Sequence, residues 1–379
     1  MSTDIFSMWS GLIVVFVVST AVQLVAWLVI YRRLAGYSTS EALPLERWPS
    51  LTVIVCARNE AENLRRHLPC VLEQDYPHYD VLVVDDDSHD ATSQVLSVLQ
   101  EHYPHLHVLR VAPKTSPGKK TALTQAIVAA RSEWLVFTDA DCWPTSAQWL
   151  QQLARAMRTA PGRQVEIVLG YGPLARRRGL LSAFSRFETA HTALQYSALA
   201  LAGMPYMGVG RNLAWQKHLF ARTEGFRAHA DMVSGDDDLF VNAAATRQNT
   251  ALCLHPDSFV YSEAPSTWAG WLHQKRRHLS TGSRYRLMHR IVLSALAGSH
   301  GLHYLLLLPL AAQGAGTLAL VCWSVRIGVA WVLYALIARH LRVCDLLPIF
   351  PLLDAMLGLY FVLFVPFALA FPPHRLRWR

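Results

Sequence analysis

The stretch VLVVDDDSHDAT, residues 81–92, decides the fold of this chain. A short apolar run, Val81 to Val84, ends at the three consecutive aspartates Asp85, Asp86 and Asp87, and a helical pattern follows from about Ala91. An apolar run of this length, bounded by polar turn residues, predicts a buried strand followed by a loop and a helix. The order of strand, acidic tip and helix is typical of parallel sheets that bind a ligand at the strand tips.

The same alternation repeats on both sides of this stretch. We expect strands at 51–56, 81–84, 108–111 and 134–137, and helices at 60–74, 91–99 and 119–130. Strands that alternate with helices predict a doubly wound, mainly parallel α/β sheet.

Polar residues follow three of these strands, at Arg58 to Glu60, Asp85 to Asp87 and Asp139 to Asp141. Since the carboxyl ends of parallel strands share one edge of a sheet, these tips should converge on one crevice. Neighbouring carboxylates repel each other unless a cation lies between them, which makes Asp139 and Asp141 candidate ligands for Mg²⁺ or Mn²⁺. A solvated acidic turn is the alternative for this pair. For Asp85 and Asp86 the alternative is to cap the helix that begins near Ala91.

The N-terminal segment, residues 1–36, is predicted to be a membrane anchor. The run from Ile5 to Tyr31 has no charged residue, and Arg32 and Arg33 follow it at once. A helix needs about 20 apolar residues to cross a bilayer. A secretory signal peptide carries its positive charge before the apolar run, so we interpret this segment as an uncleaved anchor whose C-terminal end faces the cytosol.

The C-terminal segment, residues 291–379, is predicted to hold about three more membrane helices. It is apolar, with a break at Gln313 to Gly316, an internal Arg326 and a last run that ends near Phe371. Three spans would place the basic tail (His374, Arg375, Arg377, Arg379) outside, against the positive-inside tendency. An interfacial or re-entrant stretch at Leu346 to Leu353 would return the tail to the cytosol, and a buried soluble helix is the alternative for any single run.

Composition fits a soluble domain joined to membrane segments. The chain has 379 residues, 52% of them hydrophobic, a net charge of +8 and a mean hydropathy of +0.21. Basic residues beside apolar runs, among them Lys275 and Arg276, fit anionic lipid headgroups better than nucleic acid. The six cysteines are scattered, which argues against a disulfide framework or a zinc site. Leu180 to Ala202, preceded by Arg176 to Arg178, is either a core helix or an interfacial one.

Seven ordered motifs between about residues 45 and 290 together resemble the family-2 glycosyltransferases, which have the GT-A fold. The motifs are VIVCARNEAENL (53–64), VVDDDSHDAT (83–92), GKKTAL (118–123), TDADCWP (138–144), GVGRNLAW (208–215), SGDDDLF (234–240) and QKRRHLSTG (274–282).

The resemblance implies a role for each matching position. Nucleotide-sugar contacts would come from Ala57, Glu60, Asp85, Asp86, Lys119 and Asp139, and metal ligands from Asp139 and Asp141. In SGDDDLF, Asp237 matches the catalytic base. In QKRRH, Gln274 and Arg277 match the family's QxxRW pattern, whereas His278 replaces its tryptophan. The acceptor and leaving-group region would comprise Arg211, Asn212, Asp236, Arg276 and His278.

The function expected from the resemblance is inverting, metal-dependent sugar transfer. The donor would be a nucleotide-sugar, by family frequency a UDP-sugar, and the acceptor a membrane lipid or a lipid-linked group. Asp237 would deprotonate the acceptor hydroxyl, while basic side chains such as Arg277 would stabilise the departing diphosphate. We expect a multi-pass protein of the cytoplasmic membrane with its catalytic domain, residues 45–290, in the cytosol.

Three other functions share some of these features. A processive polysaccharide synthase would need a transmembrane channel, for which three or four spans are few. A catalytically silent scaffold is disfavoured by the intact Asp139, Asp141 and Asp237. Nucleotidyl transfer would not explain an acceptor base close to a membrane-flanked QKRRH. His278 is either a second base or a structural, headgroup-facing residue.

Overall fold

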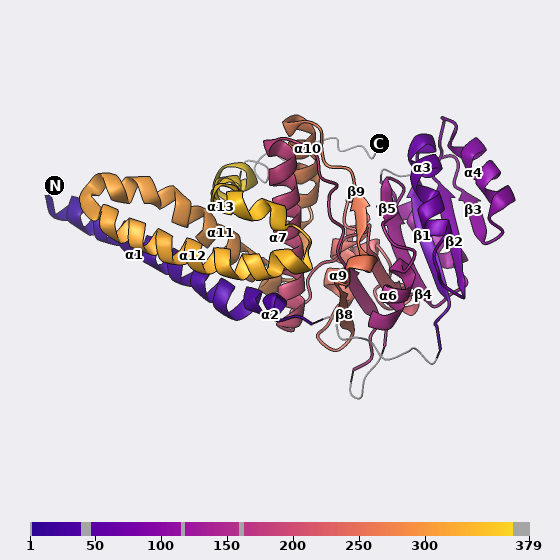
Figure 1. Cartoon of the computed structure of the whole chain (residues 1–379), viewed down its shortest axis with the longest axis horizontal. Helices are drawn as coiled ribbons and strands as arrows, with labels where there is room; N and C mark the ends of the chain where they lie inside the picture. Colours follow the sequence, from indigo (N-terminus) through magenta and orange to yellow (C-terminus); the bar gives the residue numbers. More distant parts are fainter. Residues whose placement is uncertain (1, 39–46, 115–117, 159–162, 367–379) are drawn as a thin grey trace. The chain divides into compact units, whose positions relative to one another are not determined.

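The computed structural model describes residues 2–38, 47–114, 118–158 and 163–366, which form two compact units (Figure 1). Of the described residues, those within 38–176 and 203–264 form the sheet unit, and those within 2–37, 177–202 and 265–366 form the helical unit. The segments on either side of Gly203–Ala264 therefore group with the apolar helices. The division at residues 36, 45 and 290 that we expect from the sequence stays a prediction.

The sheet unit is built on a seven-stranded sheet in the order β3-β2-β1-β4-β7-β6-β8. Its strands are β1 Leu51–Ala57, β2 Tyr79–Asp85, β3 Leu106–Arg110, β4 Trp134–Asp139, β6 Ile167–Gly170, β7 Leu213–Gln216 and β8 Thr250–Cys253. Among these strands only β7 is antiparallel to its neighbours. The mainly parallel, doubly wound sheet expected from the sequence is confirmed.

Amphipathic helices flank this sheet, and a small β5–β9 pair adjoins it. The helices are α3 Ala61–Leu72, α4 Thr92–His102, α5 Lys120–Ala129, α6 Trp149–Ala156, α8 His218–Arg222 and α9 Asp238–Ala244, and the pair is Cys142–Pro144 with Val260–Ser262. In α3 the buried residues Leu64, Leu68 and Val71 recur every three or four positions, so one helix face enters the core. All seven residues of β1 are buried, as expected for an inner parallel strand.

The strand register brings the polar tips to one edge of the sheet. Asp139 pairs with Cys56, and Asp85 pairs with Ala57, so β1, β2 and β4 end side by side. Leu213, the first residue of antiparallel β7, pairs with Phe137 near the end of β4. The loop before β7 therefore reaches the same edge. The convergence of the three acidic or polar tips is confirmed.

Among the residues that the structure describes, the helical unit holds three helical stretches that are long and apolar enough to cross a membrane: Ser10–Ala35, Leu287–His340 and Cys344–Phe364. The first continues α1 Ser2–Val25 into α2 Arg32–Ala35, and the second contains α11 Leu287–Leu310 and α12 Gly316–His340. The chain turns back between α11 and α12 at Gly314, whose φ of 85° lies in the left-handed region. The break expected at 313–316 is therefore confirmed.

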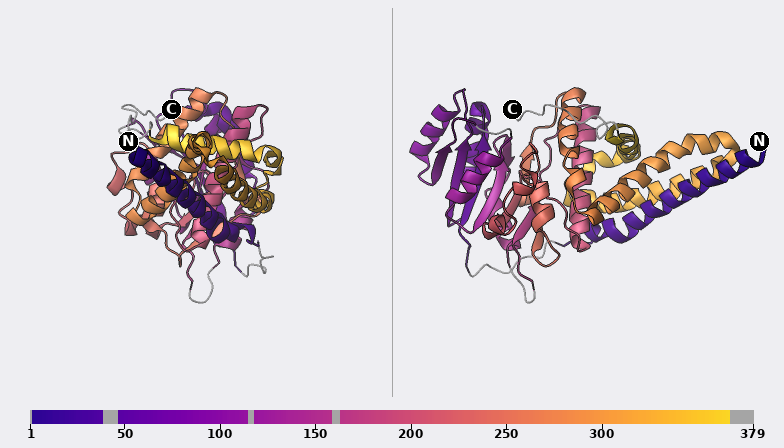
Figure 2. Two further views of the ribbon diagram at one scale, coloured as in Figure 1. Left: turned by 90° about the vertical axis from the view of Figure 1, so that its left-hand side faces the viewer. Right: turned by 180° about the vertical axis from the view of Figure 1, so that it is seen from behind.

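These long helices lie side by side, as Figures 1 and 2 show for α1, α11 and α12. The third stretch is shorter and less regular, with α13 Phe350–Leu359 at its centre and Pro348 just before it. The predicted end of this run at Phe371 and the basic tail beyond it lie outside the described residues.

A buried ion pair explains how Arg326 fits inside an apolar helix. Its guanidinium pairs with Asp354 of α13, and both side chains are at most 1% exposed. Arg326 Nη2 also donates to Gln23 Oε1 of α1 at 3.2 Å, and the Tyr304 hydroxyl of α11 donates to Asp354 Oδ2 at 2.6 Å. A charge among apolar helices is costly unless it is paired and hydrogen-bonded. This network therefore ties together α1, α11, α12 and α13.

Two further helices belong to the helical unit: α7 Leu180–Leu201 and α10 Trp268–Leu279. Most of α7 is buried, and Arg186 forms a bidentate pair with Asp345 at 2.7 and 2.9 Å. Of the two alternatives for this segment, the structure favours the core helix. Lys275 of α10 is only 9% exposed and pairs with Glu188 of α7, so its expected contact with lipid headgroups is wrong.

We predict that removing one charge of the Arg326–Asp354 pair destabilises the helical unit more than removing both charges. Asp354→Ala leaves a buried guanidinium unpaired and should lower the free energy of unfolding by about 3–5 kcal/mol. The double variant Arg326→Met/Asp354→Leu should recover most of that loss, because it removes both charges. Unfolding of the full chain in lipid vesicles measures both effects.

The matched control is Asp345→Ala, because the Asp345 carboxylate is 25% exposed whereas that of Asp354 is 1% exposed, so water screens the pair with Arg186 more strongly. We expect it to cost less than Asp354→Ala. Equal losses for the single Asp354 variant and the double variant would contradict the assignment.

Candidate active site

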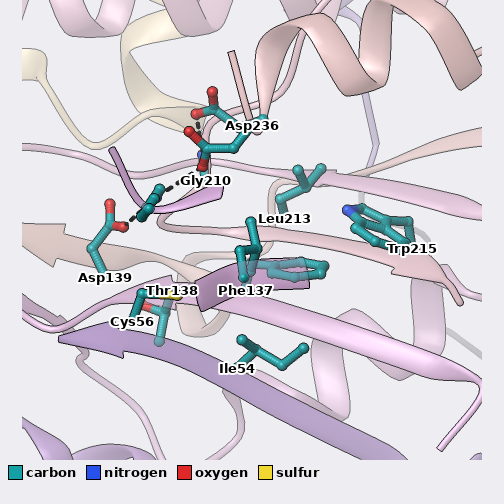
Figure 3. A pocket seen from close by; sticks show the side chains of 12 residues that line it. Ile54, Cys56, Phe137, Thr138, Asp139, Gly210, Leu213, Trp215 and Asp236 are labelled. Carbon is teal, nitrogen blue, oxygen red and sulfur yellow. Dashed lines mark hydrogen bonds and ion pairs between the residues drawn. The ribbon is translucent and has the colours of Figure 1, made fainter. Parts of the chain in front are cut away.

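One lysine, Lys119, lies between carboxylates that come from distant parts of the sequence. Lys119 is the residue before α5, and its Nζ lies 3.0 Å from Asp139 Oδ1 at the end of β4. The same Nζ lies 3.0 Å from Asp236 Oδ2, just before α9. Figure 3 shows Asp139 on one side of the pocket and Asp236 with Gly210 on the other. The structure thus joins the TDAD and SGDDD motifs through a single ammonium group.

Electrostatics keep this lysine charged. Burial by itself lowers the pKa of Lys119, but the charges of Asp139, Asp236 and Asp237 together outweigh burial and hold that pKa well above its ordinary value. The ammonium group therefore persists at neutral pH. It supplies the positive charge that allows carboxylates to gather in a half-buried site.

Asp237, the predicted base, is held by backbone groups at the N-terminus of α9. Its Oδ2 accepts a hydrogen bond from Gly210 N at 2.7 Å, and its Oδ1 accepts one from Asp238 N at 2.8 Å. A Cβ on Gly210 would lie 3.1 Å from Asp237 Oδ2, so the residue there has to be small. Burial, followed by the charges of Asp236 and Asp238, raises the pKa of Asp237 to about 7. A carboxyl with this pKa can accept a proton at neutral pH.

Asp139 and Asp141 form a candidate pair of metal ligands. Their carboxylate oxygens and the Cys142 sulfur all lie within 4.8 Å of one another. Burial and the charge of Asp141 hold the pKa of the Cys142 thiol well above its usual range. The S–H donates to Asp141 Oδ1 at 3.3 Å. Carboxylate ligands suit a hard cation such as Mg²⁺ or Mn²⁺.

Nearby groups shift the pKa of Asp141 in opposite directions. Although part of the Asp141 side chain is exposed to solvent, burial and then the charge of Asp139 raise its pKa. The Arg211 guanidinium lowers the pKa of Asp141 in turn. Arg211 is oriented by hydrogen bonds from Nε and Nη2 to the Gly172 carbonyl at 2.9 and 2.5 Å. A cation is thus held close to the TDAD motif.

The loops after β1 and β2 are joined by hydrogen bonds. Asp86 N donates to the Ala57 carbonyl at 2.9 Å, and Glu60 N donates to Thr92 Oγ1 at 2.9 Å. Ala57 is fully buried, whereas Glu60 is partly exposed. Burial and then the charges of Asp141 and Asp139 raise the pKa of Glu60, against a hydrogen bond from Asn63. Glu60 therefore lies within electrostatic reach of the TDAD motif.

Asp85 and Asp86 are buried; Asp85 is hydrogen-bonded and Asp86 forms an ion pair. Neither residue caps the following helix. Asp85 Oδ2 accepts from Ser93 Oγ at 2.7 Å, and Asp86 pairs with Lys114. The helix N-terminus is instead served by Asp90, whose Oδ1 accepts from Thr92 N at 2.9 Å. Sequence reasoning missed Lys114. The available signal was its position shortly after the predicted strand 108–111, at the same edge of the sheet.

The structure corrects the expectation for Asn212. Its side chain has no exposed surface, so it cannot touch an acceptor. Its Oδ1 accepts from Trp149 Nε1 at 3.1 Å, and its Nδ2 donates to the Tyr171 and Ser258 carbonyls at 2.8 and 2.7 Å. All of these bonds are internal. Asn212 therefore has a structural role: its side chain joins Trp149 of α6 to the backbone at Tyr171 and Ser258.

The remaining predicted residues belong to the other unit. Gln274, Arg276, Arg277 and His278 lie on α10 in the helical unit, whereas Asp139, Asp236 and Asp237 lie in the sheet unit. Within α10, His278 is exposed and Gln274, Arg276 and Arg277 are partly buried. Their predicted roles stay predictions.

Apolar side chains line part of the pocket that holds the charged groups. The pocket around Lys119 is also lined by Ile54, Phe137, Leu213 and Trp215. Figure 3 shows Phe137 and Ile54 beneath Asp236, with Leu213 and Trp215 to the right. Phe137 and Trp215 stack with their ring centroids 4.7 Å apart. These apolar side chains exclude water from one side of the pocket, which strengthens the ion pairs of Lys119 with Asp139 and Asp236.

Part of the chain is similar in sequence to curated glycosyltransferases. Glycosyltransferase AglE of Haloferax volcanii is 35% identical over 124 residues, which are 32% of this chain and 39% of that protein. Beta-monoglucosyldiacylglycerol synthase of Trichormus variabilis is 31% identical over 117 residues, which are 30% of this chain and 25% of that protein. The match thus spans less than two-fifths of either relative.

A solved structure resembles nearly the whole chain. The mannosyltransferase PcManGT from Pyrobaculum calidifontis, in complex with GDP-Man and Mn²⁺, superposes with a TM-score of 0.56 and 21% identity, and the match covers 92% of this chain and 97% of that one. The GT-A type of fold is confirmed. The model of a family described as "Glycosyltransferase like family 2" matches residues 49–281, more than half of the chain. The chain therefore belongs to glycosyltransferase family 2.

Proposed function

We propose that this glycosyltransferase moves a sugar from a nucleotide-sugar to a membrane lipid or lipid-linked hydroxyl, with inversion at the anomeric carbon. The observation that carries the proposal is the position of Lys119, which pairs with Asp139 on one side and Asp236 on the other. Asp139 belongs to the candidate metal pair, and Asp236 precedes the candidate base Asp237. Donor and acceptor chemistry would therefore meet within one charged site.

The donor diphosphate would bind where Asp139, Asp141 and Arg211 gather. Mg²⁺ or Mn²⁺ on the two carboxylates would supply charge stabilisation for the diphosphate leaving group. PcManGT, which has the same fold, is in complex with GDP-Man and Mn²⁺, and this supports a divalent ion here. Glu60, Asp85 and Asp86, from the β1 and β2 tips, border the same edge and would face the base and ribose. UDP is the default nucleotide.

The transfer step needs one base. Asp237 would take the proton from the acceptor hydroxyl as its oxygen attacks the anomeric carbon. The bond from that carbon to the diphosphate oxygen breaks, and the nucleoside diphosphate leaves. The two backbone N–H groups on Asp237 fix the direction of its carboxylate. A single displacement of this kind inverts the anomeric configuration.

A lipid acceptor follows from the apolar helices and from a relative. Three stretches of the chain can cross a membrane, and one curated relative is named a beta-monoglucosyldiacylglycerol synthase. Arg32 and Arg33 at the end of the first stretch favour a cytosolic catalytic unit in the cytoplasmic membrane, where nucleotide-sugars are made. Gln274 and Arg277 of α10 would serve the leaving group.

The test of this function uses the full chain in lipid vesicles with Mn²⁺ and a panel of UDP- and GDP-sugars. We expect one donor to release its nucleoside diphosphate in step with sugar transfer, and NMR of the product to show the opposite anomer. Release of pyrophosphate or of a nucleoside monophosphate would instead indicate nucleotidyl transfer and overturn the proposal.

Asp139→Asn and Asp141→Asn should each abolish transfer and weaken donor binding in the presence of Mn²⁺, because the diphosphate would lose its counter-charge. Asp141 should be the more sensitive, since Asp139 also pairs with Lys119. Calorimetry with donor and Mn²⁺ measures the loss. Asp80→Asn, near the start of β2 and thus at the opposite edge, is the control. Unchanged donor binding in the double variant would show that the metal assignment is wrong.

Asp237→Asn should still bind donor but lose at least about a hundredfold in kcat, the usual contribution of a positioned base. In the wild type, kcat/KM should fall as the pH drops below about 7, because the raised pKa of Asp237 leaves it protonated there. Steady-state kinetics from pH 5 to 9 give this profile. An acidic limb near pH 4, or near-normal turnover of Asp237→Asn, would move the role to another group.

The product should be a lipid that carries one sugar or very few. Mass spectrometry after reaction in a defined lipid mixture should show a single hexose-sized increment on a lipid, and this increment should be absent with Asp237→Asn. A ladder of long, water-soluble polymer would support the processive synthase and contradict a lipid acceptor.

A further inference from the structure

A second lysine, Lys120, is buried beside Lys119 and holds a different part of the chain. It is the first residue of α5 and is 7% exposed. Its Nζ donates to the carbonyl oxygens of His229 at 2.5 Å and Met232 at 2.9 Å. Both acceptors belong to the backbone that leads to the SGDDD motif. A buried ammonium satisfied by backbone carbonyls fixes the position of that backbone.

The neighbours of Lys120 hold the same segment. Gly118 has a φ of +83°, and a Cβ built on it would lie 2.7 Å from the Val233 carbonyl oxygen. Lys119 pairs with Asp236 at 3.0 Å. Three consecutive residues, 118–120, therefore contact the chain at several points between 229 and 236.

The segment also packs on itself just before the candidate base. His229 is 5% exposed, and a Cβ on Gly235 would lie 3.4 Å from its ring. Gly235 has a φ of +100°, which a residue with a side chain rarely adopts. Two residues later Asp237 forms the N-cap of α9. A shift of the backbone at 229–233 would therefore pass directly to Asp237.

We propose that Lys120 is a positioning residue. It holds the backbone of residues 229–233 in place and thereby fixes the position of the Asp237 carboxylate at the edge of the sheet where β1, β2 and β4 end. The inference rests on the proposed function, in which Asp237 is the base. Without the ammonium, both carbonyls lose a charged donor. The His229 carbonyl keeps the bond from Met232 N at 3.1 Å, whereas the bonds that tie this segment to α5 through Lys120 are lost, so the segment is free to shift. A displacement of about 1 Å in a reacting group can cost about a hundredfold in rate.

The chain offers a matched control in Lys217. Its Nζ likewise donates to two backbone carbonyls, those of Val128 at 3.0 Å and Ala130 at 2.7 Å. These carbonyls lie at the other end of α5, and Lys217 follows β7 at the edge of the sheet opposite to Asp139. Lys120 and Lys217 thus make the same kind of contact at opposite ends of one helix.

The experiment compares Lys120→Met, Lys120→Arg and Lys217→Met with the wild type, all as full chains in lipid vesicles. Lys120→Met should lose about a hundredfold in kcat, with donor affinity in Mn²⁺ nearly unchanged. Lys120→Arg should recover most of the loss, because a guanidinium can also donate to two carbonyls. Lys217→Met should keep its kcat.

Hydrogen exchange measures how firmly Lys120 holds this backbone, without any need for activity. The amides of residues 227–235 should exchange faster in Lys120→Met than in the wild type and in Lys217→Met. If the wild type transfers no sugar from any donor, the proposed function fails, and exchange still tests the hold of Lys120 on this backbone.

Three results would overturn the inference. They are unchanged exchange at 227–235, an equal loss of kcat in Lys217→Met, and a loss of donor affinity that accounts for the whole effect of Lys120→Met.

Discussion

One buried ammonium group allows the rest of the site to exist. Asp139, Asp236 and Asp237 would repel one another if they met at the edge of a sheet without a cation, and burial would add to that cost. Lys119 lies within 3.0 Å of the first two, and its charge lowers the pKa of the third. Burial and the other carboxylates still leave that pKa near 7. A base that titrates in the neutral range therefore results from a balance of opposing charges.

The residues at the beginning of α5 make the contacts that bring these charges together. Gly118 allows the chain to approach Val233, Lys119 joins the two acidic motifs, and Lys120 bonds to the backbone before Asp237. Lys114, a few residues earlier, pairs with Asp86 and donates to the Gly118 carbonyl at 2.7 Å. The connection between β3 and α5 thus links the expected nucleotide side of the site to its catalytic side.

The helical unit handles charge by the same rule. Arg326 is tolerated inside an apolar helix because Asp354, Tyr304 and Gln23 surround it with acceptors and donors. Lys275 and Glu188 pair between α10 and α7 in the same way. Lys119, Arg326 and Lys275 thus each have a carboxylate partner, which offsets the cost of desolvation, whereas the buried Lys120 is held by backbone carbonyls. The two sets of pairs differ in position: those in the helical unit join helices, whereas those of Lys119 line a pocket at the polar edge of the sheet.

Much of this protein could be predicted from the sequence, because the features concerned are local. Short β-rich runs predicted four parallel strands, and the polar residues that follow three of them predicted a common edge. Long apolar runs predicted the apolar helices, and the break at Gln313 to Gly316 predicted the turn between two of them. These patterns depend on a repeat of a few residues, which the sequence displays directly. The three-dimensional structure alone decided which charges pair. Lys119 meets Asp236, Lys120 meets His229, and Asn212 is buried by Trp149, Tyr171 and Ser258. Such partners lie tens of residues to more than a hundred residues apart. Their pairing depends on how the elements pack, and no local repeat records which of many lysines, aspartates or asparagines will lose its water.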